Sequence, residues 1–449
     1  MNNENFKVIV VGGGLVGLTL AHSLAKASID YVVLEGRRSI AEDAGASLVV
    51  TPDGMRALAQ LGLLDSLLKI SVEMIDMRSS ISNGIGSYIF HRAHLVKMLY
   101  DRLSPENQSR VLTNKKLAGI VADDSGVTVT CADGTKYEGS IVIGADGVHS
   151  RTREQMRSLA LKASPTIDID DEKPFVCNYR TMWCSFPLQG ENHGGPPGTA
   201  WFAHAKDHSA QCVIGLERSW VFVYERLPNG PVKMGTRYTE KDAIEFAEKY
   251  SHMAACGNLI VRDVFPQRYT VGMAVLEEGV LKRWSWGRIV LTGDAAHKFT
   301  PNQGLGYING MHDAIALTNE LHRALHTPSQ EPGSEKNQNG PSLEVLSAAF
   351  ERYYKSRINE VQDDWNVSSM ETQMCAWYNG LYWFADYWVQ PYLPRSAHVL
   401  LARYVISNRA SRGQVLDFTD DKEPFPNATI PWKHLIPGPA RLFLMDVWM

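Results

Sequence analysis

The sequence predicts an α/β protein, in which a Rossmann-like domain is split by an inserted antiparallel sheet and followed by C-terminal helices. Two observations support this fold class. At three points, near residues 12, 144 and 293, a short β-branched run leads into a glycine turn and a helix start. That is the order of a βα unit in a parallel sheet. Between the second and third points lie aromatic, β-rich segments separated by glycine and proline loops, which are typical of antiparallel strands.

The first forty residues carry the strongest local signal. An apolar run, 7–11, leads into three consecutive glycines and an apolar helical stretch, and a second strand-like run ends at Glu35. This order is the dinucleotide-binding fingerprint. Gly12 permits the tight turn, Gly14 lets the backbone approach a pyrophosphate, and Gly17 lets the helix pack close to the sheet.

Glu35 indicates which dinucleotide is bound. A carboxylate at this position accepts hydrogen bonds from ribose hydroxyls and disfavours a 2′-phosphate, so the fingerprint favours FAD or NAD over NADP. The helix N-terminus that follows Gly14 offers free N–H groups to the phosphates. The alternative is a glycine-rich turn that binds nothing.

Composition restricts the class of protein. The chain has 449 residues, which suits two interleaved domains, and its net charge of −4 argues against nucleic-acid or anionic-membrane partners. Six scattered cysteines without a CxxC pair indicate a reducing compartment and no metal site. No apolar run reaches the ~18–20 residues of a membrane span. We therefore expect a cytoplasmic protein without a transmembrane segment, and peripheral membrane association stays open.

Two further strand ends carry polar residues. Arg92 opens a helix after a strand-like run, where it either contacts a cofactor or is solvated. Residues 115–140 alternate in period two, which predicts a β-meander, and the next strand leads into a turn that contains Asp146. Asp146 and Ser150 are also good helix-capping residues, which is the structural alternative for this turn.

The third signal begins at Gly293-Asp294 and continues to a glycine-rich helix start at Gly304 and Gly306. Asp294 at a strand end can hydrogen-bond a ribityl hydroxyl, although a helix cap is the alternative. The N–H groups at the helix start can face an electron-accepting ring. The helix is expected to run to residue 326.

These signals divide the chain. Its expected parts are a first nucleotide-binding part at 1–172, a substrate-binding sheet at 173–280, a second nucleotide-binding part at 281–326, a surface loop at 327–342 and a helical region at 343–449. The helical region is strongly aromatic. We expect most of its aromatic side chains to lie in the core and a few to wall an apolar pocket.

Taken together, the three sites resemble those of the FAD-dependent aromatic hydroxylases, the single-component (group A) flavoprotein monooxygenases with a fold like p-hydroxybenzoate hydroxylase. The resemblance covers about residues 6–320 and implies cofactor contacts by each motif. The implied FAD contacts are Gly12, Gly14, Gly17 and Glu35 from the fingerprint, Arg92 from an Arg-x-x-Leu helix, Asp146 from a DGxxSxxR motif, Gly293 and Asp294 from a GD motif, and Gly304 and Gly306 from the ring-facing loop.

At a finer level the chain looks like the fungal paxilline-type epoxidases, which oxidise terpenoid and indole-alkaloid scaffolds. The resemblance rests on Gly45-Ala46-Ser47, which adds Gly45 to the expected cofactor contacts, on Tyr179-Arg180, and on the C-terminal stretches 415–418 and 431–434. The chain departs from the family near the ring. Leu305, Ile308 and His312 stand where the family usually has Gln, Asn and an acid.

The resemblance implies a monooxygenase that uses FAD, NADPH or NADH, and O2. One oxygen atom passes to an electron-rich carbon or alkene and the other leaves as water. Arg180 is the expected catalytic residue, pointing from the sheet toward the flavin and donating a hydrogen bond there, whereas a surface arginine is the alternative. The presence of one nucleotide fingerprint fits transient binding of the nicotinamide.

The aromatic-rich sheet favours a bulky, apolar, ring-containing substrate. The favoured reaction is 2,3-epoxidation of a prenylated indole alkaloid, with rearrangement to an oxindole as an option, and epoxidation of a meroterpenoid or other terpenoid alkene is the alternative. Two other readings stay open: a reductase or oxidase of the same fold, and a non-catalytic FAD-fold escort protein.

Overall fold

The computed structural model describes most of the chain. The described residues are 6–43, 46–75, 85–190, 194–326, 341–394, 396–397, 409, 411–419 and 425. Gly45, most of the predicted surface loop at 327–342, and residues 431–434 lie outside this part.

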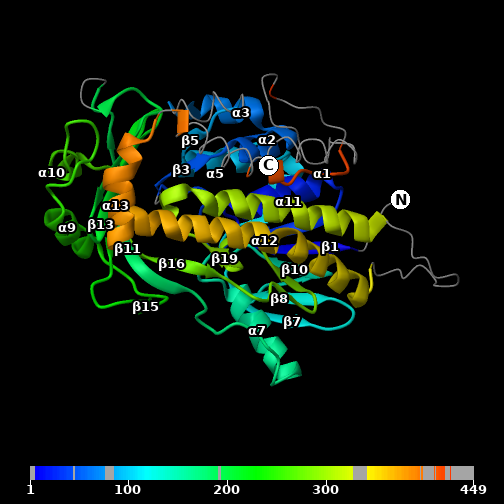
Figure 1. Ribbon diagram of the computed structural model, residues 1–449. Helices are drawn as coiled ribbons and strands as arrows, with labels where there is room; N and C mark the ends of the chain where they lie inside the picture. Colours follow the sequence, from blue (N-terminus) through cyan, green and yellow to red (C-terminus); the bar gives the residue numbers. More distant parts are fainter. Residues whose placement is uncertain are drawn as a thin grey trace.

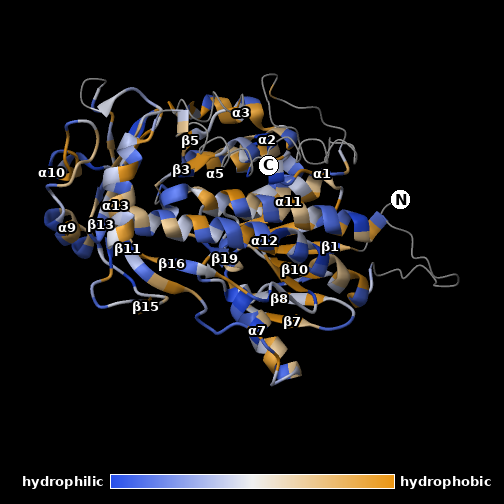
Figure 2. Ribbon diagram, in the orientation of Figure 1, coloured by the Kyte–Doolittle hydropathy of each residue, from blue (hydrophilic) through white to orange (hydrophobic). Residues whose placement is uncertain are grey.

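A six-stranded sheet forms the nucleotide-binding half, as predicted. Its strand order is β17-β18-β10-β1-β2-β6, and every neighbouring pair is parallel except β17 with β18. The strands are β1 (Lys7–Val11), β2 (Asp30–Leu34), β6 (Val111–Leu112), β10 (Ile141–Gly144), β17 (Ser285–Trp286) and β18 (Ile289–Leu291). β10 and β18 are buried throughout and β1 and β2 nearly so, and Figure 2 shows β1 and β10 as hydrophobic. Such runs suit a sheet that is covered on both faces.

Helices cover one face of this sheet, and a meander with another helix covers the other face (Figure 1). The first layer contains α1 (Leu15–Lys26), α5 (Arg92–Asp101) and α11 (Leu305–His326), with α12 (Leu343–Cys375) packed on α11. The second layer contains the predicted meander, β7 (Leu117–Ala122), β8 (Val127–Cys131) and β9 (Lys136–Gly139), with α7 (Arg151–Ala163). Smaller elements are α2 (Pro52–Gln60), α3 (Leu64–Lys69), α6 (Pro105–Ser109), β3 (Ser47–Val50), β4 (Ser71–Glu73) and β5 (Tyr88–His91).

The chain segment between β10 and β18 forms most of the predicted antiparallel sheet. Its order is β12-β13-β14-β11-β16-β19, with β15 beside β11. The strands are β11 (Val176–Pro187), β12 (Ala200–Ala205), β13 (His208–Ile214), β14 (Arg218–Arg226), β15 (Val232–Lys233), β16 (Thr270–Val280) and β19 (His297–Lys298). The helices α9 (Glu240–Lys249) and α10 (Val261–Val264) contribute to a hydrophobic cluster with side chains of this sheet.

The long strand β16 was not predicted. Its sequence carries two glycines and two consecutive glutamates, which weaken the alternating pattern of a strand. Gly272 of this strand faces the indole ring of Trp183 so closely that a Cβ atom at position 272 would clash with it. The glycine is therefore required by a contact between two strands, which the local sequence does not reveal.

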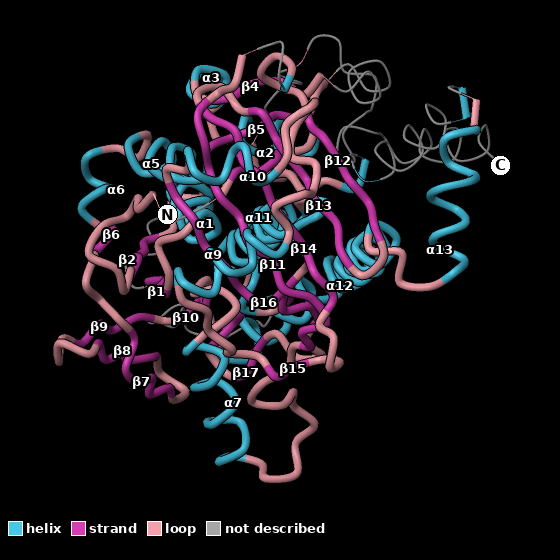
Figure 3. The backbone as a smooth tube through the Cα atoms, turned by 90° about the vertical axis from the view of Figure 1, so that its left-hand side faces the viewer, coloured by secondary structure: helices cyan, strands magenta, loops and turns pink. Residues whose placement is uncertain are grey.

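The prediction that most C-terminal aromatic side chains lie in the core was wrong. After α12 the chain forms α13 (Gly380–Phe384), a π-helical turn (Ala385–Val389) and a 3₁₀ turn (Gln390–Tyr392), and Figure 3 shows α13 at the periphery of the molecule. Many of their large side chains are exposed, from 41% for Trp383 to 75% for Tyr392. In the described part of the chain, no helix combines the length and apolarity that a bilayer crossing needs.

Candidate functional site

A cavity of about 1790 Å³ lies between the two sheets. The strands β1, β2, β10 and β18 end at one edge of the parallel sheet, because the carboxyl ends of parallel strands meet there. The motif residues that follow these strands therefore converge on the cavity. The predicted site residues that line it are Gly12, Gly14, Glu35, Arg92, Asp146, Asp294, Gly304 and Gly306.

The glycines of the fingerprint have different surroundings. Gly12 has a φ of +107°, and a Cβ atom there would clash with the carbonyl oxygen of Ala145. A Cβ on Gly17 would clash with the carbonyl oxygen of Gly12, so Gly17 sets the packing of α1 and does not line the cavity. A Cβ on Gly14 would meet nothing within 4 Å, because Gly14 borders the open cavity. The backbone therefore leaves room for a bulky group in front of Gly14.

The N-terminus of α1 faces this room. Gly14 is its N-cap residue, and no side chain caps the helix. Leu15 and Val16 of the first turn line the cavity. Uncapped N–H groups and the positive end of the helix dipole favour an anion here. Glu35 completes this corner, and its carboxylate accepts hydrogen bonds from the backbone N–H groups of Gly13 (2.7 Å) and Arg37 (2.8 Å).

Asp146 lies in the turn between β10 and α7. Its carboxylate accepts hydrogen bonds from the Ser150 hydroxyl (2.5 Å) and from the backbone N–H of Thr152 (3.0 Å). Burial raises the pKa of Asp146, and these hydrogen bonds oppose the shift. Ser150 caps α7, as predicted, by accepting a hydrogen bond from the Arg153 N–H at 2.9 Å.

Arg153 joins two of the motifs. Its guanidinium donates to the carbonyl oxygen of Val148 (2.7 Å) in its own turn and to that of Ala295 (3.1 Å) in the GD turn. The side chain is buried and does not line the cavity. Arg153 therefore holds the Asp146 turn and the Asp294 turn together.

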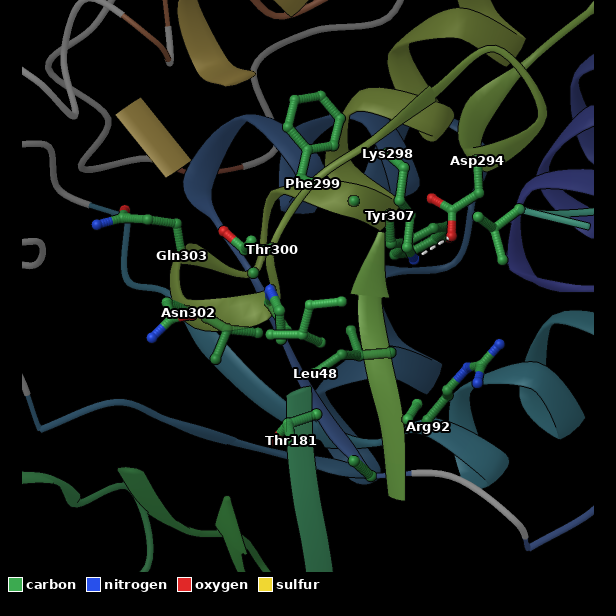
Figure 4. Close-up of a pocket in the computed structure, with 18 of the residues that line it drawn as sticks. Leu48, Arg92, Thr181, Asp294, Lys298, Phe299, Thr300, Asn302, Gln303 and Tyr307 are labelled. Carbon is green, nitrogen blue, oxygen red and sulfur yellow. Dashed lines mark hydrogen bonds and ion pairs between the residues drawn. The ribbon is translucent and has the colours of Figure 1, made fainter. Parts of the chain in front are cut away.

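Asp294 and Arg92 lie on the cavity wall, where Figure 4 shows both side chains with Lys298. The Lys298 ammonium donates to the Asp294 carboxylate at 2.5 Å. Burial lowers the pKa of Arg92, and the charge of Asp294 opposes that shift. The sequence analysis missed Lys298, although its position four residues after Asp294 could have indicated it.

A buried ionic network fixes the GD turn from behind. The Asp313 carboxylate accepts from the backbone N–H of Gly293 (2.9 Å) and from Nε of Arg357 (2.9 Å), and Nε2 of His297 lies 2.6 Å from it. Burial alone would raise the pKa of Asp313, but His297, Arg357 and the Gly293 N–H outweigh it and lower the pKa to about 2. Gly293 is thus positioned by this network and does not line the cavity.

The three departures from the family pattern point away from the cavity. Leu305 and Ile308 are buried in the main hydrophobic core, and the neighbouring cavity-lining residues are Gly304, Gly306 and Tyr307. His312 is buried beside Asp53, with 2.8 Å between Nε2 and the carboxylate, and its Nδ1 accepts from the N–H of Gln414 at 3.1 Å. His312 therefore connects α2 and α11 with the C-terminal segment.

The other side of the cavity is largely apolar. The antiparallel sheet contributes Thr181, Trp183, Phe202, Phe222, Tyr224 and Met273, and the C-terminal helices contribute Met374, Ala385, Val389 and Leu393. His204 and Glu371 also line this wall, and Asp386 pairs with His204 without lining the cavity itself. Both carboxylate oxygens of Asp386 lie within 3.0 Å of Nδ1 of His204, and Asp386 also accepts from Nε1 of Trp377 at 2.7 Å. The sequence analysis missed His204, Glu371 and Asp386, which no motif connects.

Arg180 does not line the cavity. Side chains alternate along β11, and Thr181 and Trp183 face the cavity. The Arg180 guanidinium instead donates to the buried carboxylate of Glu225 at 2.5 Å and lies over the ring of Phe246 on α9. The structure thus differs from the expected orientation, because the strand register places Arg180 on the helix-covered face of the sheet.

The residues present fit FAD. A dinucleotide needs a phosphate-binding helix end, a carboxylate for ribose and an adjoining space for a flat ring. The uncapped α1 with open space at Gly14, Glu35 at the end of β2, and the Gly304–Gly306 loop supply these three features on one cavity wall. The volume exceeds the ~300–1,000 Å³ of a typical single-ligand pocket, so a second molecule can be accommodated.

Comparisons with known proteins agree with this geometry. The family model described as "FAD binding domain" matches residues 5–169 and 256–331. The chain is 32% identical to the FAD-dependent monooxygenase esdpE of Penicillium shearii, over 99% of this chain and 92% of that protein. It is 31% identical to the FAD-dependent monooxygenase srdH of Neurospora crassa, over 95% of this chain and 98% of that protein.

Solved structures share the fold. The crystal structure of Klebsiella pneumoniae HpxO, complexed with FAD and uric acid, superposes with a TM-score of 0.65 over 91% of this chain and 96% of that one, at 20% identity. The relatives, the matching domain model and the fingerprint lead to one conclusion: the chain belongs to the FAD-dependent monooxygenases.

Proposed function

We propose that this chain uses NADPH or NADH and O2 to oxygenate a bulky, apolar, ring-containing natural product, with 2,3-epoxidation of a prenylated indole alkaloid as the favoured reaction. One observation carries the proposal. A single cavity joins the fingerprint residues to the aromatic face of the antiparallel sheet, so a dinucleotide and an apolar molecule can meet inside the protein. HpxO, which shares the fold, was crystallised with FAD and a ring compound, uric acid.

Each motif has a binding role in this proposal. The N-terminus of α1, in front of Gly14, holds the diphosphate, and Glu35 accepts hydrogen bonds from the adenosine ribose. Asp294, oriented by Lys298, would accept from a ribityl hydroxyl, and Arg92 and Asp146 line the same cavity and would offer further polar contacts to FAD. Gly12, Gly17 and Gly293 contribute through their lack of a side chain. They allow the segments behind these contacts to pack closely together.

FAD, when bound, supplies the redox and oxygen chemistry. The protein orients the two molecules and excludes water from the space between them. The Gly304–Gly306 loop would lie beside the ring, and the apolar side chains of Trp183, Phe222 and Met374 would keep the opposite wall dry. A dry wall would exclude water from the reaction space and favours an apolar substrate.

The first test is the absorption spectrum of the purified protein, before and after NADPH in air, with a panel of indole alkaloids. We expect a yellow protein whose bleaching accelerates with one compound, and incorporation of one atom of ¹⁸O₂ into the product. Bleaching by NADPH without oxygen incorporation would indicate a reductase or oxidase. A protein that binds no flavin after reconstitution would indicate an escort role instead.

A further inference from the structure

One carboxyl group in the cavity has no role in the proposed FAD site. Glu371 lies on α12 and lines the cavity next to the loop residue Gln303. The other acidic residues of the cavity wall are either in the nucleotide motifs or within 4.0 Å of a histidine nitrogen, as Asp53 is with His312 and Glu277 with His149. Within the described residues, no lysine, arginine or histidine nitrogen lies within 4.0 Å of the Glu371 carboxyl group.

Glu371 makes few direct polar contacts. Its hydrogen-bond partners are the thiol of Cys375, at 3.8 Å, and the side chain of Gln303. Burial raises the pKa of Glu371, and the nearby His204 opposes the shift. A buried carboxyl group that forms no direct ion pair is unfavourable as an anion, so a cation that enters the cavity would be attracted to it.

The neighbouring dyad holds this part of the wall in place. Asp386 binds Nδ1 of His204 and Nε1 of Trp377, which fixes the π-helical turn against β12. Ala385 and Val389 of the same turn line the cavity beside Met374. Glu371 therefore places a carboxyl group beside the apolar side chains of this wall, and a few polar groups in an apolar lining are the usual arrangement of a ligand pocket.

We propose that Glu371 recognises a basic nitrogen on the substrate and that the substrate is a ring-containing amine. The proposal rests on the proposed function, because it assigns the substrate class of the same cavity. The amine nitrogen donates a charge-assisted hydrogen bond to the carboxylate, and the apolar rings lie against Trp183, Phe222 and Met374. The titratable neighbours of Glu371 are His204, Cys375 and Asp386.

The test compares two probes that differ by one atom. 1,2,3,4-Tetrahydro-β-carboline carries a basic amine, and 1,2,3,4-tetrahydrocarbazole has a CH₂ group in its place. Binding to the FAD-loaded protein is measured by titration calorimetry. We expect the amine to bind about 10-fold tighter or more, as a charge-assisted hydrogen bond provides. Glu371→Gln should abolish this preference, and Glu371→Asp should retain part of it.

Glu351→Gln is the matched control, because Glu351 lies on the exposed face of the same helix and pairs with Lys355. It should keep the full preference. An equal affinity of the wild-type protein for both probes, or an unchanged preference in Glu371→Gln, would overturn the assignment. Calorimetry needs no turnover, so this failure is distinct from failure of the proposed function, which the NADPH and ¹⁸O₂ measurements report.

Discussion

The two walls of the cavity are built differently. On the FAD side, glycine turns and the start of α1 border the cavity, and Glu35, Asp146 and Asp294 follow strands of one parallel sheet. On the opposite side, side chains from an antiparallel sheet and from C-terminal helices form the surface. The first wall has little tolerance for change, because a backbone position cannot adapt. Single substitutions can change the second wall without altering the first wall. This arrangement suits a family whose members share a cofactor.

The largest effect is expected at Gly12. Gly12→Ala places a Cβ against the carbonyl oxygen of Ala145 in a backbone conformation with φ of +107°. We expect a loss of about 3–5 kcal/mol in the free energy of unfolding, measured by urea denaturation, and little bound flavin. Gly14→Ala is the paired variant. Open space at Gly14 should let it fold normally, yet its methyl group should weaken FAD binding. Equal stability of Gly12→Ala and the wild type would contradict this account.

The network behind the GD turn should show the next largest effect. Asp313→Asn removes the charge opposite the buried Arg357, and we expect a loss of about 3–5 kcal/mol at pH 7. The pKa of Asp313 is about 2 in the folded protein, against ~3.9 in an unfolded chain. The ionised Asp313 therefore contributes its full stabilisation of the folded protein above pH ~4, and this contribution is lost as the pH falls toward 2. Denaturation between pH 7 and 3 should show this acid-dependent loss in the wild type and less of it in the variant.

The next variant concerns Arg180, which lies on the face of the antiparallel sheet that does not line the cavity. Because Arg180 pairs with Glu225 on the far face of the sheet, Arg180→Met should lower stability by about 1–2 kcal/mol. Flavin content and the fraction of NADPH consumption that yields product should stay unchanged. Lys249 and Tyr250 still hydrogen-bond Glu225, which limits the loss. An increase in hydrogen peroxide release at normal stability would instead support the catalytic role that the family resemblance implies.

The smallest effect is expected for the stability of Glu371→Gln. Burial raises the pKa of Glu371 in the folded protein. As the pH rises above ~4.3, the usual pKa of a glutamate, the unfolded chain ionises more readily than the folded protein, so the wild type loses stability. Glutamine cannot ionise, so the variant should be slightly more stable than the wild type at pH 8 and equal to it at pH 4. Thermal melting at the two pH values measures the difference. A variant that is less stable at pH 8 would show that the carboxylate is stabilised by the protein.

The sequence predicted one wall far better than the other. Gly12, Gly14, Glu35, Asp146 and Asp294 each follow a strand at a spacing that local physics requires, and all of them line the cavity. Arg180 was expected there as well. Successive residues of a strand point to opposite faces of the sheet, and only the pairing of β11 with β14 decided which face Arg180 occupies.

The C-terminal region shows the same limit. Its aromatic residues are helical in pattern, yet Trp383, Tyr387 and Trp388 are largely exposed. Hydrophobicity predicted their burial, but the packing of the described elements leaves about half of each side chain exposed.

The sequence by itself determined the α/β class, the inserted sheet, the dinucleotide fingerprint and the family, because these depend on short-range patterns of glycine, charge and hydrophobic periodicity. The tertiary structure alone decided which side chains meet across the cavity. His204 lies on a strand and is 182 positions from Asp386, which belongs to a turn close to the helix that carries Glu371. Their contacts depend on how the sheet and the helices pack, and packing depends on the whole chain at once.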